Sequence, residues 1–398
     1  MKSYYGYITY DNNKIESVEF ITNKSFNSIK FTVINDFKTE IKIQKIYGYF
    51  NSLGYVTFLN CHYEKNEKGC AVNYYEYSIE FVLVGGWIEN IASPIFSKII
   101  LAIPKLCNWT RLSSVEESRD NINFLEYEEV LIHKSDKMTV NLIPACNINR
   151  NYVNNTTLIS EFINVKINFS TPKTYTELVA NIKEIKKLFL FLANIDTNSS
   201  TKLFTKESNE AYDFFWDGNK SIGHNDFEIL DPSFEEVSPS LDKVIHQWFT
   251  QDKIKASIDL ILEKLVNNSL SVENHFLKTC FSIEILHRKL GGVKRRNFKD
   301  RLRDLKEYFE KILSDSCDTE KYIQKIVDTR NYLVHMDSDT RVEFNEKEIP
   351  FAALYIESII RIKVLELLGL NDAVLNRLFP KVKDTIGRFY ERDILNEV

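Results

Sequence analysis

The sequence predicts an α+β protein, in which a mainly antiparallel β-sandwich-like domain precedes an all-α helical bundle. Three observations support this class. Bulky and polar residues alternate up to about residue 170, apolar residues recur at helical spacing after Pro239, and 398 residues exceed the usual size of one domain. We therefore expect a β-rich N-terminal domain over residues 1–235, with a helix near 174–194, and a helical domain over residues 236–398.

The clearest strand is expected at 75–81, where bulky and polar residues alternate over seven positions. Similar short runs lie at 28–34, 40–46 and 163–169, and clusters of Asn, Asp, Gly and Lys separate them. Such spacing is typical of a mostly antiparallel sandwich or a rolled sheet.

Beyond the strands the pattern changes. The polar segments 197–204 and 217–238 are expected to be loops, and helical spacing of apolar residues begins after Pro239. The helix expected from Pro350 has a proline at its start and Gly369 after its last apolar residue, which is the usual asymmetry of helix ends. The helices expected in the C-terminal part span 241–249, 253–266, 272–290, 298–312, 319–336, 350–368 and 371–389.

The composition is that of a soluble protein able to bury sizeable cores, with 44% hydrophobic and 27% charged residues. A net charge of −5 argues against wholesale coating of nucleic acid, but it leaves room for a local basic patch. The N-terminus has no apolar core like that of a signal peptide, and the longest apolar stretches are too short to cross a bilayer. We therefore expect a cytoplasmic protein with no membrane partner.

No motif for a metal or a cofactor stands out. The six cysteines are scattered, so reduced thiols are expected. Cys61, His62 and Cys70 fit no common zinc spacing and lack a fourth ligand. A P-loop, a Gly-rich dinucleotide turn and a Ser-His-Asp arrangement are all missing from the sequence. The sequence thus predicts no metal and no cofactor.

The most informative segment is 323–335, in a predicted helix. Arg330 projects from the middle of its apolar stripe, where a charge is costly unless it is paired. Asn331 and His335 are four positions apart, so they share a neighbouring face. The apolar stripe consists of Ile323, Ile326, Val327, Leu333 and Val334.

The preceding helix at 272–290 offers a partner for Arg330. Glu284 falls within an apolar face, and two opposite charges on inward faces of adjacent helices predict a Glu284–Arg330 contact. This pair could also be purely structural and only fix the helix register. The apolar face is defined by Phe276, Leu277, Cys280 and Phe281.

These residue types suit the cleavage of RNA. Attack by a ribose 2′-OH on its own phosphate needs a base, and departure of the 5′-oxygen needs an acid; histidine can perform either task. An arginine can hold the negative charge of the pentacoordinate intermediate, and Asn331 can position the phosphate or the imidazole. The motif supplies one histidine, so a two-fold dimer that joins two copies of the motif would provide both groups.

Two motifs carry a family resemblance. Arg330-Asn331-x3-His335 resembles the R-x4–6-H signature of HEPN ribonucleases. Glu284-x3-Arg288 is similar to the E-x3-K/R motif on the preceding helix of many HEPN domains. A β-rich domain followed by a HEPN helical bundle resembles the ApeA-like family of anti-phage defence proteins.

The resemblance implies a bacterial, metal-independent endoribonuclease of an abortive-infection system, which cuts RNA such as tRNA after phage infection. It also implies a homodimer through the HEPN domain and leaves room for a phage-derived trigger at the N-terminal domain. In HEPN toxins silenced by adenylylation, a tyrosine lies two residues after the histidine. Asp337 occupies that position here, which argues against this form of control.

A basic run follows the Glu284 helix, with nine Lys or Arg and only two Asp over residues 288–306. Next to the motif, it predicts contacts with an RNA backbone, although a solvated helix face would have the same composition. The RNA-binding candidates are Arg288, Lys289, Lys294, Arg295 and Arg296.

Two other functions remain open from the sequence. One is a non-catalytic HEPN module that binds a nucleotide or RNA through Arg330 and His335. The other is an interaction protein, whose β-rich domain senses a phage component and whose helices only dimerise. The intact Arg330, Asn331 and His335 set favours the ribonuclease, because a binding module has no need of a titrating histidine.

Overall fold

The computed structural model describes residues 2–10, 13–22, 27–33, 41–68, 73–89, 93, 95–117, 122–125, 129–151, 154, 156–195, 197, 199–206, 210–216, 232–266, 271–291, 296–335 and 344–390. The chain divides into two compact units. Unit 1 comprises Met1–Lys183 and Thr197–Ser221, and unit 2 comprises Glu184–Asp196 and Ile222–Val398.

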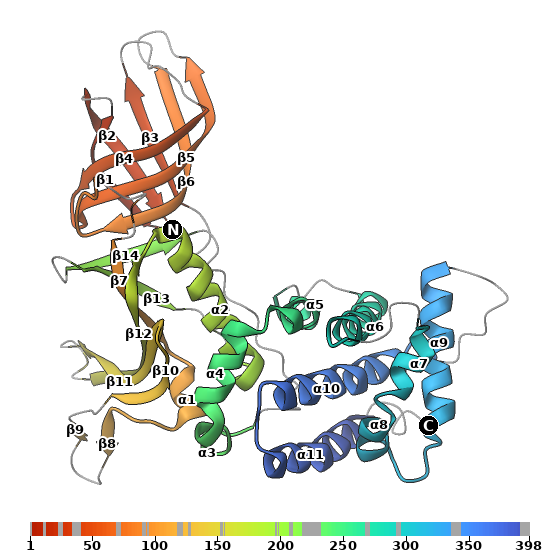
Figure 1. The fold of residues 1–398 in the computed structure, drawn as a ribbon. Coiled ribbons are helices and arrows are strands. Elements are labelled where there is room, and N and C mark those ends of the chain that lie inside the picture. Colours follow the sequence, from red (N-terminus) through yellow and green to blue (C-terminus); the bar gives the residue numbers. More distant parts are fainter. Residues whose placement is uncertain are drawn as a thin grey trace. The chain divides into compact units, whose positions relative to one another are not determined.

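A closed antiparallel barrel forms the first part of unit 1 (Figure 1). Its strands follow the order β6-β3-β2-β1-β4-β5, and the pairing of β5 with β6 closes it. Alternate residues of each strand face a core in which Phe20, Phe58 and Tyr77 are at most 1% exposed. The strands are β1 (Lys2–Tyr10), β2 (Asn13–Thr22), β3 (Asn27–Val33), β4 (Lys42–Phe50), β5 (Gly54–Lys68) and β6 (Asn73–Val84).

The strand β6 joins the barrel to a sheet extension. Residues Asn73–Ser78 of β6 pair with β3, whereas Phe81–Val84 pair with β14. The extension runs in the order β10-β11-β12-β7-β13-β14-β6 with antiparallel neighbours. Its strands are β7 (Phe96–Ile103), β10 (Val130–Lys134), β11 (Met138–Asn151), β12 (Thr156–Lys173), β13 (Ser200–Thr205) and β14 (Ala211–Trp216), and a separate hairpin consists of β8 (Val115–Glu117) and β9 (Ile122–Phe124).

The predicted fold class is confirmed, with the N-terminal strands rolled into a barrel that carries extra strands. The four expected strands coincide with β3, β4, β6 and part of β12. The loop expected at 197–204 is wrong, because β13 begins at Ser200 and pairs with both β7 and β14. Pairing with β7 and β14 satisfies the backbone hydrogen bonds of β13, although only a short stretch of its polar sequence alternates with apolar residues. Of the loop expected at 217–238, residues 217–231 lie outside the described residues.

Unit 2 is helical, and the expected helices agree closely with those of the structure. The exception is the helix expected at 298–312, which is two helices separated by Asp304 and Leu305. There the amide of Leu305 donates to the carbonyl of Leu302, an i to i−3 bond that tightens the chain and ends the first helix. The helices are α3 (Phe234–Val237), α4 (Leu241–Thr250), α5 (Asp252–Val266), α6 (Val272–Lys289), α7 (Phe298–Arg303), α8 (Lys306–Ile312), α9 (Thr319–His335), α10 (Ile349–Leu367) and α11 (Asp372–Tyr390).

Two more helices complete the chain. The short helix α1 (Leu106–Thr110) belongs to unit 1. The helix α2 (Tyr175–Ala193), expected at 174–194, contributes its first half to unit 1 and its second half to unit 2. None of the described helices is both long and apolar enough to cross a membrane.

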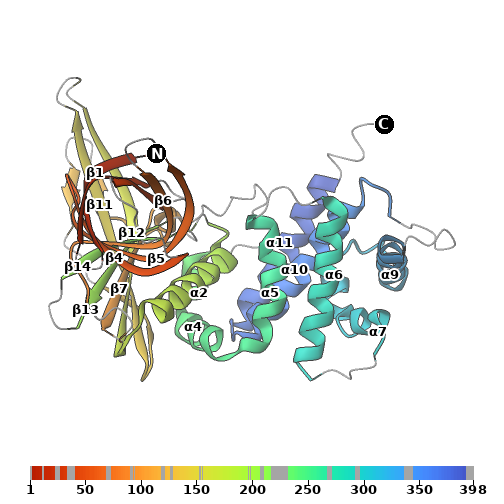
Figure 2. The ribbon, with the colours of Figure 1, turned by 90° about the horizontal axis from the view of Figure 1, so that it is seen from above.

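The central helix of unit 2 is α10, which packs against α6 and α11 (Figures 1 and 2). Its residues are buried on every side, as expected for a helix surrounded by others. Beside it, α5 and α6 approach closely at Ser257 and Ser282, whose buried hydroxyls lie 2.6 Å apart. Each hydroxyl also donates to the other residue's carbonyl, so small side chains link the helices without a buried unpaired group. This packing holds α6, which carries Glu284.

Candidate active site

The helices α6 and α9 carry the predicted motif and contact each other. Ile323 and Ile326 are fully buried, and they seat the first half of α9 on the bundle. The expected apolar stripe weakens toward the end of α9, where Val334 is 40% exposed. Thr329 is buried and accepts a hydrogen bond from the amide of Phe344 over 3.3 Å. The last turn of α9 therefore leaves the core directly after this anchor.

The predicted contact between Glu284 and Arg330 is present. Arg330 Nη2 lies 3.1 Å from Glu284 Oε1, and the side chains are 19% and 14% exposed. Arg288 Nη2 lies 3.1 Å from the other carboxylate oxygen, although the Arg288 side chain is 56% exposed. One half-buried carboxylate thus accepts from two guanidinium groups, so the cluster keeps one net positive charge.

Two aromatic rings flank the Arg330 guanidinium. Its Cζ atom lies 5.5 Å from the ring centre of Phe298 and 5.9 Å from that of Phe281. Both distances are within the range of a cation–π contact. Phe298 is 9% exposed and Phe281 is 38% exposed, so one ring is closed off and the other is open. Their spacing in the sequence predicts Phe281 only as part of the apolar face of its helix and gives no sign that either ring lies near Arg330.

The remaining donors of Arg330 are only partly used. Nη1 donates to Asn331 Oδ1 over 3.2 Å. Nε is buried and has no hydrogen-bond partner among the described residues. A buried donor without an acceptor costs about 1–3 kcal/mol. The guanidinium is therefore held in place but not saturated by its neighbours.

Asn331 and His335 lie farther along the same helix, as expected. Asn331 is half-buried, whereas His335 is exposed and is the last residue of α9. At a rise of about 1.5 Å per residue, His335 lies roughly 7.5 Å beyond Arg330 along the axis. The helix thus presents a cation, an amide and an imidazole in succession.

Much of the described part of the basic run is engaged within the protein. Arg296 Nη1 lies 2.5 Å from Asp304 Oδ2, Arg303 Nη2 lies 3.1 Å from Glu320 Oε2, and Arg301 is 1% exposed. Lys289 is exposed, and Lys294 and Arg295 lie outside the described residues. Surface pairing of this kind reduces the charge available to a polyanion, so the predicted RNA contacts of this run stay a prediction.

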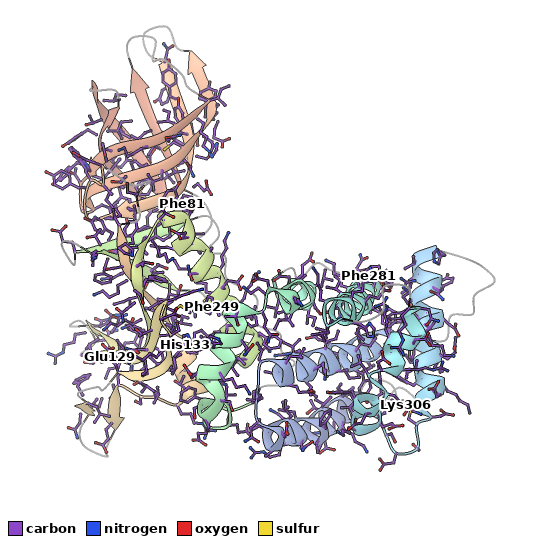
Figure 3. All side chains as sticks on the ribbon, viewed as in Figure 1. Phe81, Glu129, His133, Phe249, Phe281 and Lys306 are labelled. Carbon is purple, nitrogen blue, oxygen red and sulfur yellow. The ribbon has the colours of Figure 1, made fainter. Side chains whose placement is uncertain are left out.

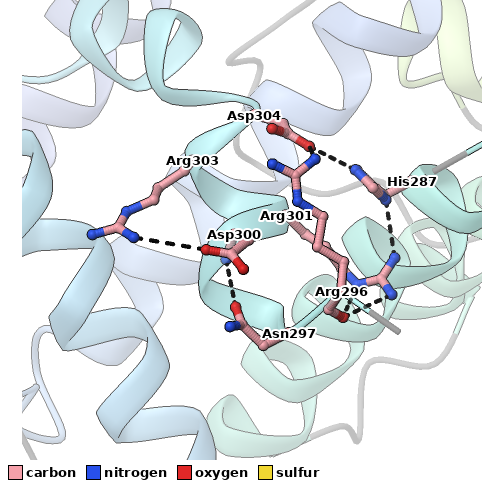
Figure 4. A network of polar contacts seen from close by, with 7 residues as sticks. All are labelled: His287, Arg296, Asn297, Asp300, Arg301, Arg303 and Asp304. Atoms are coloured by element: carbon pink, nitrogen blue, oxygen red, sulfur yellow. Dashed lines mark hydrogen bonds and ion pairs between the residues drawn. The ribbon is translucent and has the colours of Figure 1, made fainter. Parts of the chain in front are cut away.

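A network centred on the buried side chain of Arg301 accounts for part of that pairing (Figure 4). His287, on α6, joins Arg301 Nη1 at 3.0 Å and Asp304 Oδ2 at 2.7 Å. Nε and Nη2 of Arg301 donate to the carbonyl of Arg296 over 3.2 and 3.0 Å. These contacts tie α7 to α6, and Phe298 is the first residue of α7.

The neighbouring thiol is not a nucleophile of this site. Cys280 is fully buried on α6, and burial raises the pKa of its thiol well above the ordinary value, despite the opposing charge of Arg330. Among the described residues, no group of three or more His, Cys, Asp or Glu side chains could hold a metal ion.

Two family models match the chain, one in its N-terminal part and one in its helical part. A family model for the ApeA N-terminal domain 1 matches residues 2–248, and a model for the Apea-like HEPN domain matches residues 260–374. The chain belongs to the ApeA family. The HEPN match includes Glu284, Arg330, Asn331 and His335. No curated protein and no solved structure matches the chain.

The family membership confirms the predicted order of domains, an ApeA-type β-rich region followed by a HEPN domain. The ApeA N-terminal match extends beyond the barrel and its extension to α4, whereas the HEPN match begins within α5. An ApeA-like HEPN domain indicates a role in anti-phage defence.

Proposed function

We propose that this protein is a metal-independent endoribonuclease of an anti-phage, abortive-infection system, which cuts RNA such as tRNA. The observation that carries the proposal is the position of the Arg330 guanidinium. Its Nη2 lies 3.1 Å from Glu284 Oε1, and the helix that carries it, α9, ends at His335. A fixed cation and an exposed imidazole on one helix suit the transfer of a phosphoryl group, because the cation stabilises negative charge and the imidazole moves protons.

In the proposed reaction, the ribose 2′-oxygen attacks the adjacent phosphorus and loses its proton to a base. The bond from phosphorus to the 5′-oxygen then breaks, and an acid protonates that oxygen. The products are a 2′,3′-cyclic phosphate and a 5′-hydroxyl end. Arg330 stabilises the extra negative charge on the phosphorane, and His335 transfers protons.

Asn331 has a proposed role that its hydrogen bond supports. Its Oδ1 accepts from Arg330 Nη1, so its Nδ2 points the other way. That amide group is a hydrogen-bond donor. We assign it to a non-bridging oxygen of the phosphate.

Each chain supplies one histidine to this site, whereas the reaction needs an acid and a base. The proposal therefore includes a homodimer through the HEPN domain, in which two copies of α9 form one composite site. We also propose that the exposed cations Arg288 and Lys289, with Lys294, Arg295 and Arg296, contact the RNA backbone.

The two domains have separate roles in the proposal. We assign cleavage to the helical domain, residues 236–398. The β-rich domain, residues 1–235, would bind a phage-derived trigger, and the protein would act in the bacterial cytoplasm.

The test compares purified wild type with His335→Ala and with His62→Ala, in which an exposed histidine of the barrel is replaced. We expect wild type and His62→Ala to cut total tRNA in the presence of EDTA and to leave 2′,3′-cyclic phosphate ends. His335→Ala should leave the RNA intact. Binding of RNA by all three proteins without cleavage would instead favour a non-catalytic HEPN module.

A further inference from the structure

Phe281 is the exposed aromatic side chain beside the proposed site. Over the described part of residues 232–388, the exposed large apolar side chains are Val272, Phe281, Leu290 and Val334, and only Phe281 among them is aromatic. Figure 3 labels it on α6. A phenylalanine that is 38% exposed leaves a large apolar surface in water, where a ligand could cover it.

The position of Phe281 relates it to the reaction. It precedes Glu284 by three residues, so both lie on one side of α6. Its ring centre is 5.9 Å from Arg330 Cζ, and the ring centre of the buried Phe298 is 5.5 Å from the same atom. The Phe281 ring thus lies next to the Arg330 guanidinium, which in the proposed function binds the scissile phosphate.

We infer that Phe281 is a stacking platform for an unpaired base next to the scissile phosphate, and that it directs the enzyme to single-stranded loops. This inference rests on the proposed function. A nucleotide joins a phosphate to a flat aromatic base, and the site joins a guanidinium to an exposed ring. Stacking requires a base that is free of its helix, because a base inside a duplex has both faces covered.

The chemistry of the surroundings favours recognition of a base plane over recognition of base edges. The nearby side-chain acceptors are already engaged, since Glu284 accepts from two arginines and Asn331 Oδ1 accepts from Arg330. An aromatic ring with no free side-chain acceptor beside it can stack on any base, because every base has an aromatic face. The platform is thus expected to select unpaired structure with little preference for sequence.

The experiment measures binding and cleavage of one RNA hairpin that carries 2-aminopurine in its loop, with a fully paired duplex as the second substrate. Binding is measured in the His335→Ala background, so that the RNA stays intact. The stacking variants are Phe281→Leu, which keeps apolar volume but removes the aromatic ring, and Phe281→Trp, which keeps a ring. Val272→Ala is the matched control, because Val272 lies on the same helix and is 41% exposed.

Binding to the Phe281 ring should quench the 2-aminopurine fluorescence, and Phe281→Leu should abolish the quench. The same substitution should weaken hairpin binding by about 5- to 150-fold, the range that one lost base stack implies. Phe281→Trp should keep the quench and the affinity for the hairpin, and Val272→Ala should match the His335→Ala protein in both. In the active background, Phe281→Leu should also reduce the preference for the hairpin over the duplex.

Two outcomes separate this inference from the proposed function. If cleavage depends on His335 but Phe281→Leu changes neither the quench nor the preference for the loop, the platform is wrong and the nuclease stands. If no cleavage depends on His335, the proposed function fails and the platform fails with it. A third result, in which Phe281→Leu alters only the oligomeric state, would assign the ring to a contact between copies and overturn the inference.

Discussion

Arg301 donates a hydrogen bond to Nδ1 of His287 over 3.0 Å, in a partly buried contact between α7 and α6. A guanidinium can only donate, so Nδ1 is unprotonated and the imidazole proton lies on Nε2, which faces Asp304 at 2.7 Å. The network ties α7 to α6, and Phe298, the first residue of α7, lies with its ring centre 5.5 Å from Arg330 Cζ. A histidine away from the proposed reaction thereby helps to position an arginine within it.

Replacing His287 tests this relationship. In His287→Ala, the buried Nη1 of Arg301 loses its acceptor, and Asp304 loses a donor. We expect the free energy of unfolding to fall by about 1.5–3 kcal/mol, the contribution of a hydrogen bond to a charged group. Urea denaturation measures the change, with His62→Ala as the control on an exposed histidine. Equal stabilities of the two variants would show that the network is incidental.

The Glu284 carboxylate gives a second prediction. Glu284→Gln keeps the shape of the side chain but removes the charge shared by Arg288 and Arg330. Because the carboxylate is only 14% exposed, we expect a loss of about 1–3 kcal/mol in the free energy of unfolding. Glu263→Gln is the matched control, since Glu263 is 43% exposed and pairs with Lys278 at the surface. Its loss should stay below about 1 kcal/mol.

Arg330→Lys keeps the charge but not the geometry. An ammonium group is a point donor, so it cannot hold Glu284 and Asn331 in the fixed directions of a guanidinium. If Arg330 stabilises the phosphorane, the rate of RNA cleavage should fall by about 100-fold or more. Arg288→Lys, on a side chain that is 56% exposed, should lower the rate less than about 10-fold. Similar losses in both variants would argue that Arg330 acts only as a cation.

The barrel extension has a pH-sensitive contact at Glu161, on β12. Burial raises the pKa of this carboxyl, but hydrogen bonds from Ser113, Ser114 and the amide of Val115 outweigh it and hold the pKa below the ordinary value. A lowered pKa in the folded protein stabilises the fold above the ordinary carboxyl pKa of 4.5, and this stability is lost as the pH falls below that value.

The measurement compares Glu161→Gln with the wild type by urea denaturation at pH 7 and near pH 3.5. The two proteins should differ in stability at pH 7 and converge in acid, because protonation removes the same charge. A difference that stays constant with pH would exclude the carboxylate as its source.

Much of the helical unit follows from local sequence. Apolar spacing located α6 and α9 to within a residue, because the period of 3.6 is a property of the helix itself and needs no partner. The same helical wheel turned Arg330 inward and Asn331 and His335 away from the core, and so predicted the Glu284 contact. The helix expected at 298–312 was wrong at Asp304 and Leu305, because the apolar spacing continues through a break that the bond from the Leu305 amide to the Leu302 carbonyl makes.

The sequence by itself determined the class of the two domains, the bounds of most helices and the Arg330, Asn331 and His335 trio. Only the tertiary structure decided which strands meet, so β5 closes on β6 and the polar β13 becomes part of a sheet. It also decided which cations are already paired and which rings, Phe281 and Phe298, surround Arg330. The helical period is visible in residues that are close together in the sequence. Strand pairing and contacts between helices join residues that are distant along the chain, and no local pattern specifies them.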